Sequence, residues 1–306
     1  MGGIKSAPEI RRIAVVVNPL SGSTNARSLD EAKAIAEAAG VEAEFSAASG
    51  ADLIPALTAA VEAKPDLLVV IAGDGTARAA AELAGPKGVL IAPLPGGTMN
   101  MLPKALYGSR DWKTALKDIL EDGVVCDVSG GEVNGSSFYV AAILGAPALW
   151  AGAREAAREL KPLTALRRAQ RALAVAFTGR LRFAFDGGRP DRAEALTFLC
   201  PLISTELDAD ERALEAAAMD PASAAEAFRL AFHAVTDGWR RDPSVNDMKI
   251  RKGKVWASGR IPAVLDGEPC RLPRQVEVRF KARAFKALRP RQIVVVEKAA
   301  KEAEAV

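Results

Sequence analysis

A chain of 306 residues is long for a single hydrophobic core, so we expect two domains. Its hydrophobic content of 49% is typical of a folded protein and excludes a disordered one, and a net charge of +3 is too small to indicate nucleic-acid binding. The single histidine, His233, excludes Ser-His-Asp and multi-histidine metal chemistry, so any general base has to be a carboxylate.

The first half of the chain, from Arg12 to about Asp127, alternates strand-like and helix-like segments. Apolar runs bounded by turn residues predict strands within 12–19, 66–73 and 88–97, and helical periodicity predicts helices within 26–40 and 51–64. Strands separated by helices pair in parallel. We therefore expect an α/β nucleotide-binding domain over residues 1–127.

The second half reads as mainly β structure. Alternating or apolar segments predict strands within 137–145, 179–187, 193–204, 248–260, 261–269 and 274–290. Helical patterns interrupt them at 148–176 and 221–240. We expect a mainly antiparallel, sandwich-like domain over 128–290 with helical insertions, and we expect 291–306 to pack back on the first domain.

Three glycine-bearing loops follow the predicted strands of the first domain, where parallel sheets bind ligands. Glycine lets backbone N–H groups approach a phosphate closely, and the following helix directs its positive end there. Each loop alone could be a tight turn, but three at matching strand ends predict a polyphosphate site. The candidate binding residues are Asn18, Ser21, Gly22, Gly73, Asp74, Gly75, Thr76, Gly97, Thr98 and Asn100.

A further acidic turn, Asp266-Gly267-Glu268, lies between two short predicted strands of the second domain. By itself Asp-Gly at this position is typical of a hairpin, since both residues tolerate a positive φ.

The order of these motifs is similar to that of one family. Asn18-Pro-Leu-Ser-Gly22, then Ala72-Gly-Asp-Gly-Thr76, then Leu94-Pro-Gly-Gly-Thr-Met-Asn100 resemble the diacylglycerol kinase catalytic domain, a family that includes sphingosine and ceramide kinases. The resemblance covers about residues 12–106. It implies a lipid kinase that uses ATP and Mg²⁺ and transfers the γ-phosphate to the primary hydroxyl of a two-chain lipid.

The resemblance also implies that the Asp-Gly-Glu turn holds the catalytic base. The sequence does not choose between Asp266 and Glu268, and Asp74 remains an alternative base and a candidate Mg²⁺ ligand.

Several positions depart from the family pattern. Arg78-Ala79 replaces a frequent Asn-Glu, and Met101 replaces a frequent Asp. The acids that hold a structural Mg²⁺ in some relatives correspond best to Asp208, Asp210 and Glu211, where a solvated helix start is the stronger interpretation. These departures favour ceramide slightly over diacylglycerol and leave a sphingoid base open.

A lipid substrate has to be taken from a membrane. Residues 148–176 interleave basic with apolar side chains, which suits an interfacial helix on an anionic surface, although a helix packed on its own core fits equally well. The first residues lack the apolar core of a signal peptide. We expect a cytoplasmic protein on the inner face of the membrane with no nucleic-acid partner, and the sequence does not specify an oligomeric state.

Two alternatives remain open at this point. One is a soluble kinase with a similar Gly-Asp-Gly-Thr loop, such as NAD kinase or phosphofructokinase, which would lack the loop at 94–100 and the late Asp-Gly-Glu turn. The other is an inactive nucleotide- or lipid-binding regulator, which the changes at Arg78, Ala79 and Met101 favour and the retained acids and threonines oppose.

Overall fold

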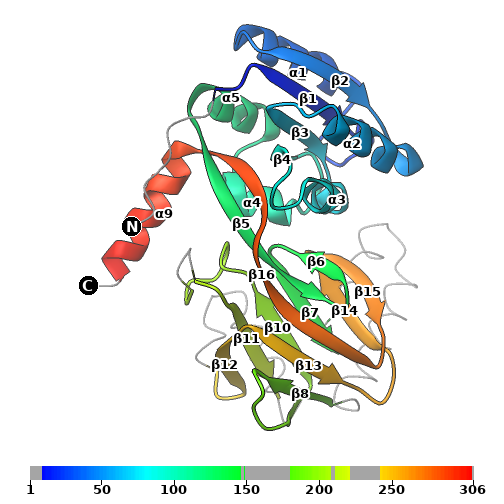
Figure 1. Cartoon of the computed structure of the whole chain (residues 1–306), viewed down its shortest axis with the longest axis vertical. Helices are drawn as coiled ribbons and strands as arrows, with labels where there is room; N and C mark the ends of the chain where they lie inside the picture. Colours follow the sequence, from blue (N-terminus) through cyan, green and yellow to red (C-terminus); the bar gives the residue numbers. More distant parts are fainter. Residues whose placement is uncertain (1–8, 146–147, 149–179, 208–210, 221–241, 305–306) are drawn as a thin grey trace. The chain divides into compact units, whose positions relative to one another are not determined.

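The computed structural model describes residues 9–145, 148, 180–207, 211–220 and 242–304 (Figure 1). They form two compact units: the first contains the chain up to Ser129 and again from Ala282, and the second contains Gly130–Lys281. The first unit is α/β and the second is an antiparallel β structure, so the predicted fold class is confirmed.

A parallel sheet forms the centre of the first unit, with the strand order β2-β1-β3-β4. The bounds are Arg12–Val17 for β1, Glu42–Ala47 for β2, Leu67–Ala72 for β3 and Leu90–Pro95 for β4. β3 is buried along its whole length, as its unbroken apolar run predicts for a strand covered on both faces. The three loops that carry the candidate binding residues therefore follow β1, β3 and β4, as expected.

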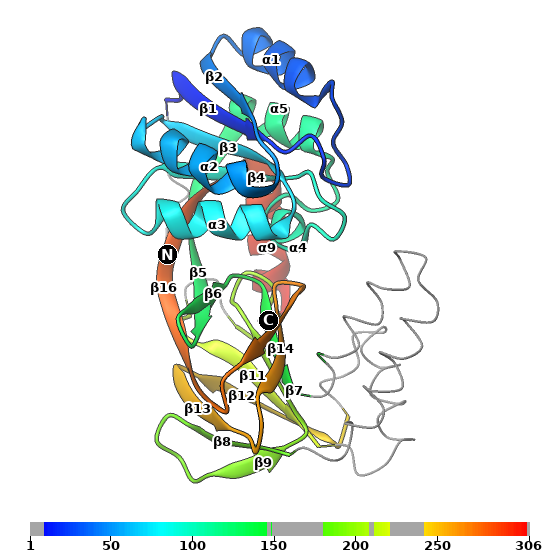
Figure 2. The same ribbon diagram turned by 90° about the vertical axis from the view of Figure 1, so that its right-hand side faces the viewer.

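Helices cover both faces of this sheet. Figure 2 shows α1 and α5 on one side and α2 and α3 on the other, and the members of each pair contact one another. The bounds are Ser28–Ala38 for α1, Leu53–Glu62 for α2 after the short η1 (Gly50–Asp52), Asp74–Ala84 for α3, Met101–Tyr107 for α4, Trp112–Asp122 for α5 and Arg291–Glu304 for α9.

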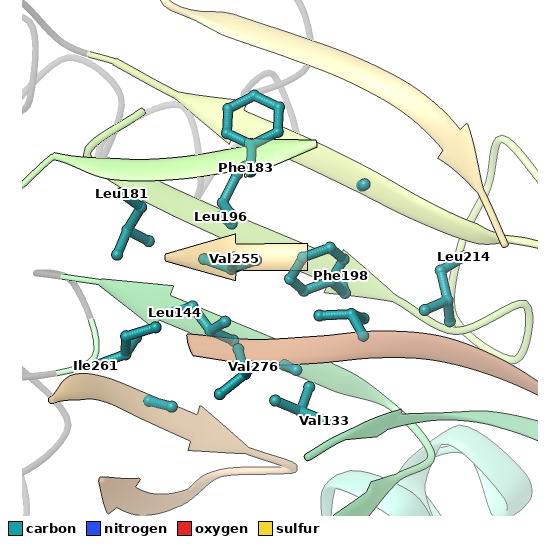
Figure 3. Packing of buried hydrophobic residues seen from close by; sticks show 14 of the residues in the cluster. Val133, Leu144, Leu181, Phe183, Leu196, Phe198, Leu214, Val255, Ile261 and Val276 are labelled. Carbon is teal, nitrogen blue, oxygen red and sulfur yellow. The ribbon is translucent and has the colours of Figure 1, made fainter. Parts of the chain in front are cut away.

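Two sheets face each other in the second unit. One joins β9 (Asp191–Ala193), β8 (Leu181–Phe185), β13 (Lys252–Trp256) and β16 (Gln275–Pro290). β5 (Gly123–Val133) pairs with β16, and β6 (Ser136–Phe138) pairs with β5. The other has the order β12-β11-β10-β7-β14-β15, with bounds Ala141–Gly145 for β7, Ala195–Leu199 for β10, Leu214–Met219 for β11, Val245–Ile250 for β12, Ile261–Leu265 for β14 and Glu268–Leu272 for β15. Their inner faces enclose one hydrophobic core, part of which Figure 3 shows.

The segment after residue 211 differs from expectation, because a helix that started at 208–211 would continue through Leu214–Met219, and these residues form a strand. This alanine-rich stretch forms β11, which pairs with β10 on one side and β12 on the other and is almost entirely buried. Two neighbouring strands and burial outweigh the helix propensity of alanine. Glu211 forms an ion pair with Lys249 at 2.9 Å, whereas Asp208 and Asp210 lie outside the described residues.

The boundary between the units falls earlier than the expected residue 290. β16 continues from the second unit into the first, where Ala287 pairs in parallel with Ile91 of β4. Residues 282–290 therefore belong with the first unit, as does α9. The helices expected at 148–176 and 221–240 lie outside the described residues, apart from Ala148, and within the described residues no helix is long and apolar enough to cross a membrane.

Candidate active site

The loop after β1 is held against the end of β3. The Asn18 N–H donates to the carbonyl of Ile71 at 2.9 Å, and the Asn18 Oδ1 accepts from the Leu20 N–H at 3.0 Å. The hydroxyl of Thr24 donates to the carbonyl of Asn18 at 2.5 Å, which closes the loop from the other side. Asn18 thus shapes the loop with its oxygens, and its amide nitrogen is the part that can donate to a ligand.

The turn from β3 into α3 places Gly73 before the helix and Asp74 in its first turn. The carbonyl of Gly73 accepts from the N–H groups of Thr76 and Ala77, so α3 begins directly at the end of the strand. Asp74 is buried, and its Oδ1 accepts from the Leu102 N–H in the first turn of α4 at 3.2 Å. Its carboxylate therefore joins the N-terminal ends of two helices, where negative charge is favoured.

The loop after β4 is closed by Asn100, which is buried and has a φ of 52°. Its Oδ1 accepts from the Gly97 N–H at 2.7 Å, and its Nδ2 donates to the Gly97 carbonyl at 2.8 Å. Both ends of the amide are engaged within the loop. Thr98, between these two residues, is exposed, and its hydroxyl is the side-chain donor that this loop offers to solvent.

The structure brings the three loops together at one edge of the sheet. A Cβ on Gly97 would lie 2.6 Å from the Cα of Gly73, and one on Gly22 would lie 2.5 Å from the Thr98 Oγ1. Ser23, which the sequence analysis missed, ties the first loop to the third: its N–H donates to the carbonyl of Gly96 at 2.8 Å and its hydroxyl to that of Gly97 at 2.7 Å. The only signal in the sequence was a small hydroxyl residue next to a loop glycine.

This edge suits a polyphosphate. It gathers glycine backbone, the hydroxyls of Thr76 and Thr98, and the N-terminal end of an 11-residue helix, all of which favour an anion. Asp74 is the only acid in the three loops, and no group of three potential metal ligands gathers among the described residues. A Mg²⁺ ion here would be held by one carboxylate together with the phosphates of its nucleotide, an arrangement that this ion accepts in proteins.

In the second unit, Asp266 and Gly267 form the two-residue turn between β14 and β15, with φ angles of 48° and 86°. These positive angles agree with the hairpin predicted from the Asp-Gly pair. The Asp266 carboxylate is buried and accepts from three successive N–H groups, those of Tyr139 (2.7 Å), Val140 (2.8 Å) and Ala141 (3.0 Å). It thereby fixes the backbone between β6 and β7.

Glu268, two residues later, is exposed. The two acids of the motif therefore have different surroundings, which their spacing in the sequence does not predict. Burial raises the pKa of the nearby Cys200 thiol well above its usual value, and the negative charge of Asp266 raises it further. Cys200 is consequently a neutral, unreactive thiol in the core.

Comparison with known proteins gives a family match for part of the chain and a fold for most of it. Residues 12–129 match the family described as the diacylglycerol kinase catalytic domain. No match was found among curated proteins.

Three solved structures are similar over most of the chain. A diacylglycerol kinase from Bacillus anthracis str. Sterne aligns with a TM-score of 0.68 and 16% identity, covering 93% of this chain and 99% of its own. Another from the same organism, provisionally described as a diacylglycerol kinase, aligns at 0.69 and 19% with the same coverage. An NAD kinase from Archaeoglobus fulgidus in complex with ATP aligns at 0.51 and 13%, covering 92% and 94%. At these identities the similarity establishes the fold.

Proposed function

We propose, from the match of residues 12–129 to the diacylglycerol kinase catalytic-domain family, that the protein transfers the γ-phosphate of ATP to the primary hydroxyl of a two-chain lipid. The convergence of three strand-end loops at Gly22, Gly73 and Gly97 is the observation that carries this proposal. Phosphoryl transfer depends mostly on positioning and on neutralising charge, and closely packed glycine loops provide the first of these.

The nucleotide phosphates bind at the loops after β1, β3 and β4. Backbone N–H groups of Gly73 and Gly75, together with the hydroxyls of Ser21, Thr76 and Thr98, are the donors, and the Asn18 amide nitrogen joins them. Asn100 acts indirectly, because its side chain holds Gly97 in place. Mg²⁺, with Asp74 as its protein ligand, would neutralise phosphate charge when bound.

We assign the proton-accepting role to Glu268. A general base needs oxygens that can approach the acceptor hydroxyl. Those of Asp266 accept from three backbone N–H groups in a buried position, whereas Glu268 is exposed. In this proposal Asp266 positions the hairpin, and the Glu268 carboxylate takes the hydroxyl proton as the lipid oxygen attacks the γ-phosphorus.

The acceptor in this proposal is ceramide or diacylglycerol. The departures at Arg78, Ala79 and Met101 favour ceramide slightly, and the description of the Bacillus anthracis neighbours favours diacylglycerol. Both lipids offer a primary hydroxyl beside two hydrocarbon chains. Either one places the protein at a membrane surface, in keeping with the expected location on the inner face of the cytoplasmic membrane.

The test is transfer of labelled γ-phosphate from Mg-ATP in neutral mixed micelles, with ceramide, diacylglycerol and sphingosine in parallel and NAD as a soluble acceptor. We expect one lipid to be labelled. Glu268→Gln should lower kcat by about 10²- to 10⁴-fold at unchanged thermal stability, because it removes only the base. Glu206→Gln, which removes another exposed glutamate of the second unit, should leave the rate unchanged.

The substitution Asp266→Asn distinguishes the roles of Asp266 and Glu268. It places an amide against the three N–H groups, so at least one buried donor loses its acceptor, at a cost of roughly 1–3 kcal/mol of stability. A stable Asp266→Asn protein with the full catalytic defect would instead make Asp266 the base. ATP binding without labelling of any lipid would favour the regulator, and labelling of NAD would favour the soluble kinase.

A further inference from the structure

The outer face of one sheet in the second unit is strongly basic. Along β8, β13 and the first part of β16, alternate side chains point into the core, among them Phe183, Val255 and Val276 (Figure 3). The residues between them point outward. The outward basic residues, here called the basic face, are Arg182, Arg192, Lys252, Lys254 and Arg279, and all five are exposed.

The strand register brings these cations together. Lys252 lies opposite Arg279, and Arg182 lies opposite both Arg192 and Trp256. Directly opposite like charges destabilise a sheet, so this arrangement is not explained by folding stability. The half-buried Trp256 places an aromatic ring among the cations.

One acid, Glu277, lies among the outward residues of β8, β9, β13 and β16. It lies 3.8 Å from the Lys254 ammonium and also pairs with Arg279. The hydrogen bond and charge of Arg279 lower the pKa of Glu277, and Lys254 and Lys252 lower it further. Glu132 of the neighbouring strand β5 also acts on Arg279. Two acids therefore oppose the five cations of the basic face, which keeps an excess of positive charge.

We propose that the basic face docks on the anionic surface of a phospholipid bilayer. A sheet face presents its cations in one layer, and each lysine or arginine near an anionic membrane strengthens binding. Tryptophan is enriched at the interface between membrane and water, where the lipid headgroups lie, because its ring is amphipathic. The choice of a bilayer over nucleic acid rests on the proposed lipid kinase, whose acceptor lies in a membrane.

Binding to vesicles in the absence of ATP tests the proposal. The full chain is sedimented with phosphatidylcholine vesicles that either contain or lack phosphatidylglycerol. Wild-type protein should bind only the anionic vesicles, and binding should fall when salt is raised from about 0.1 M to about 1 M, since the screening length shortens from about 10 Å to about 3 Å. The triple variant Arg182→Gln/Lys252→Gln/Lys254→Gln keeps the Arg279–Glu277 pair and should bind on the order of 100-fold more weakly, at about fivefold per cation.

Two controls keep the result interpretable. The variant Lys64→Gln/Lys87→Gln/Lys117→Gln removes the same charge from exposed positions of the first unit and should bind as wild type. Arg182→Lys/Lys252→Arg/Lys254→Arg keeps the charge of the basic face and should also bind as wild type. Equal weakening by both glutamine variants would overturn the proposal, since net charge alone would then explain binding.

Further outcomes distinguish membrane docking from the proposed kinase activity. The glutamine variant of the basic face should keep wild-type phosphorylation of lipid in neutral micelles, because its residues are outside the proposed catalytic set. Vesicle binding without any lipid phosphorylation would uphold the docking and reject the kinase. Binding of single-stranded nucleic acid that is tighter than binding to anionic vesicles, and that is lost in the same variant, would overturn the bilayer as the partner.

Discussion

Two short polar residues, Asn100 and Asp266, adopt positive φ angles of 52° and 48°. Few residues other than glycine tolerate this region, and asparagine and aspartate do so because their side chains can bind nearby backbone. Both use their side chains in this way, Asn100 on Gly97 and Asp266 on the backbone at 139–141. The polar atoms of these two side chains are therefore used to hold the backbone of their loops. Their neighbours Thr98 and Glu268 remain exposed.

Gly97 lies closest to the backbone of another loop, so its substitution tests the contact between the loops directly. Gly97→Ala would place a Cβ 2.6 Å from the Cα of Gly73, and backbone on both sides cannot yield without separating the two loops. We expect ATP binding to weaken by at least about tenfold, a cost of about 1.4 kcal/mol, as measured by calorimetric titration.

Two matched glycines are the controls. A Cβ on Gly73 would meet only the Cα of Gly97 at 3.8 Å, an ordinary contact, and one on Gly259 would meet nothing within 4 Å. Gly259→Ala should bind ATP normally, and Gly73→Ala should fold normally. Unchanged ATP affinity in Gly97→Ala would show that the close approach of the loops is not needed.

Among the elements, α4 is fixed at both ends. Asp74 accepts from its first turn, and the buried Arg289 of β16 donates to its last carbonyls, from Nε to Leu106 at 3.1 Å and from Nη2 to Ala105 at 3.3 Å. A cation is favoured at the C-terminal end of a helix. Arg289 also pairs with Glu297 of α9 at 2.6 Å, so the C-terminal helix is tied to the helix that follows the third loop.

The N-terminus of α5 gives a pH-dependent prediction. Asp111 caps it by accepting from the Thr114 N–H at 2.9 Å, and this hydrogen bond lowers the pKa of Asp111. A lowered pKa in the folded state means that the charged cap stabilises the protein above the unfolded-state pKa of about 3.9 and ceases to do so as pH falls through the folded-state value. Asp111→Ala should therefore cost about 1 kcal/mol at neutral pH and less in acid, measured by urea unfolding.

Asp111→Asn is the matched control for the charge. Asparagine caps helices about as well as aspartate but does not titrate, so its stability relative to Asp111→Ala should not change with pH. An Asp111→Ala cost that is the same at both pH values would contradict the contribution of the charged cap.

Prediction of the elements failed where local composition and tertiary pairing disagreed. The sequence of β2, Glu-Ala-Glu-Phe-Ser-Ala, is poor in strand formers and does not predict a strand. β2 forms because it pairs along β1 at the sheet edge. The alanine-rich sequence of β11 likewise does not predict a strand, and β11 forms because it pairs with β10 and β12. The buried strands β1, β3 and β4 were found because their apolar runs are typical of a doubly covered parallel sheet.

Because the molecule consists of two compact units, we expect ATP to stabilise the first unit and not the second. A ligand that binds only the native state at about 100 times its Kd stabilises it by about 2.7 kcal/mol. Hydrogen exchange with Mg-ATP should slow by up to about 100-fold at residues 18–24, 73–76 and 96–100, and exchange in β10 and β11 should stay unchanged. Mg²⁺ alone is the control, and protection that is equal in both units would contradict a phosphate site formed by these loops.

The sequence by itself determined the α/β and β halves, the three glycine loops at strand ends and the Asp-Gly hairpin, because each of these depends on local periodicity or on the φ preferences of single residues. Only the tertiary structure decided how Ser23, Gly73 and Gly97 meet, and that β16 continues into the first unit. The burial of Asp266 and the exposure of Glu268 also follow only from the tertiary structure. Contacts between segments far apart in the chain set burial and hydrogen-bond partners, and no local pattern encodes them.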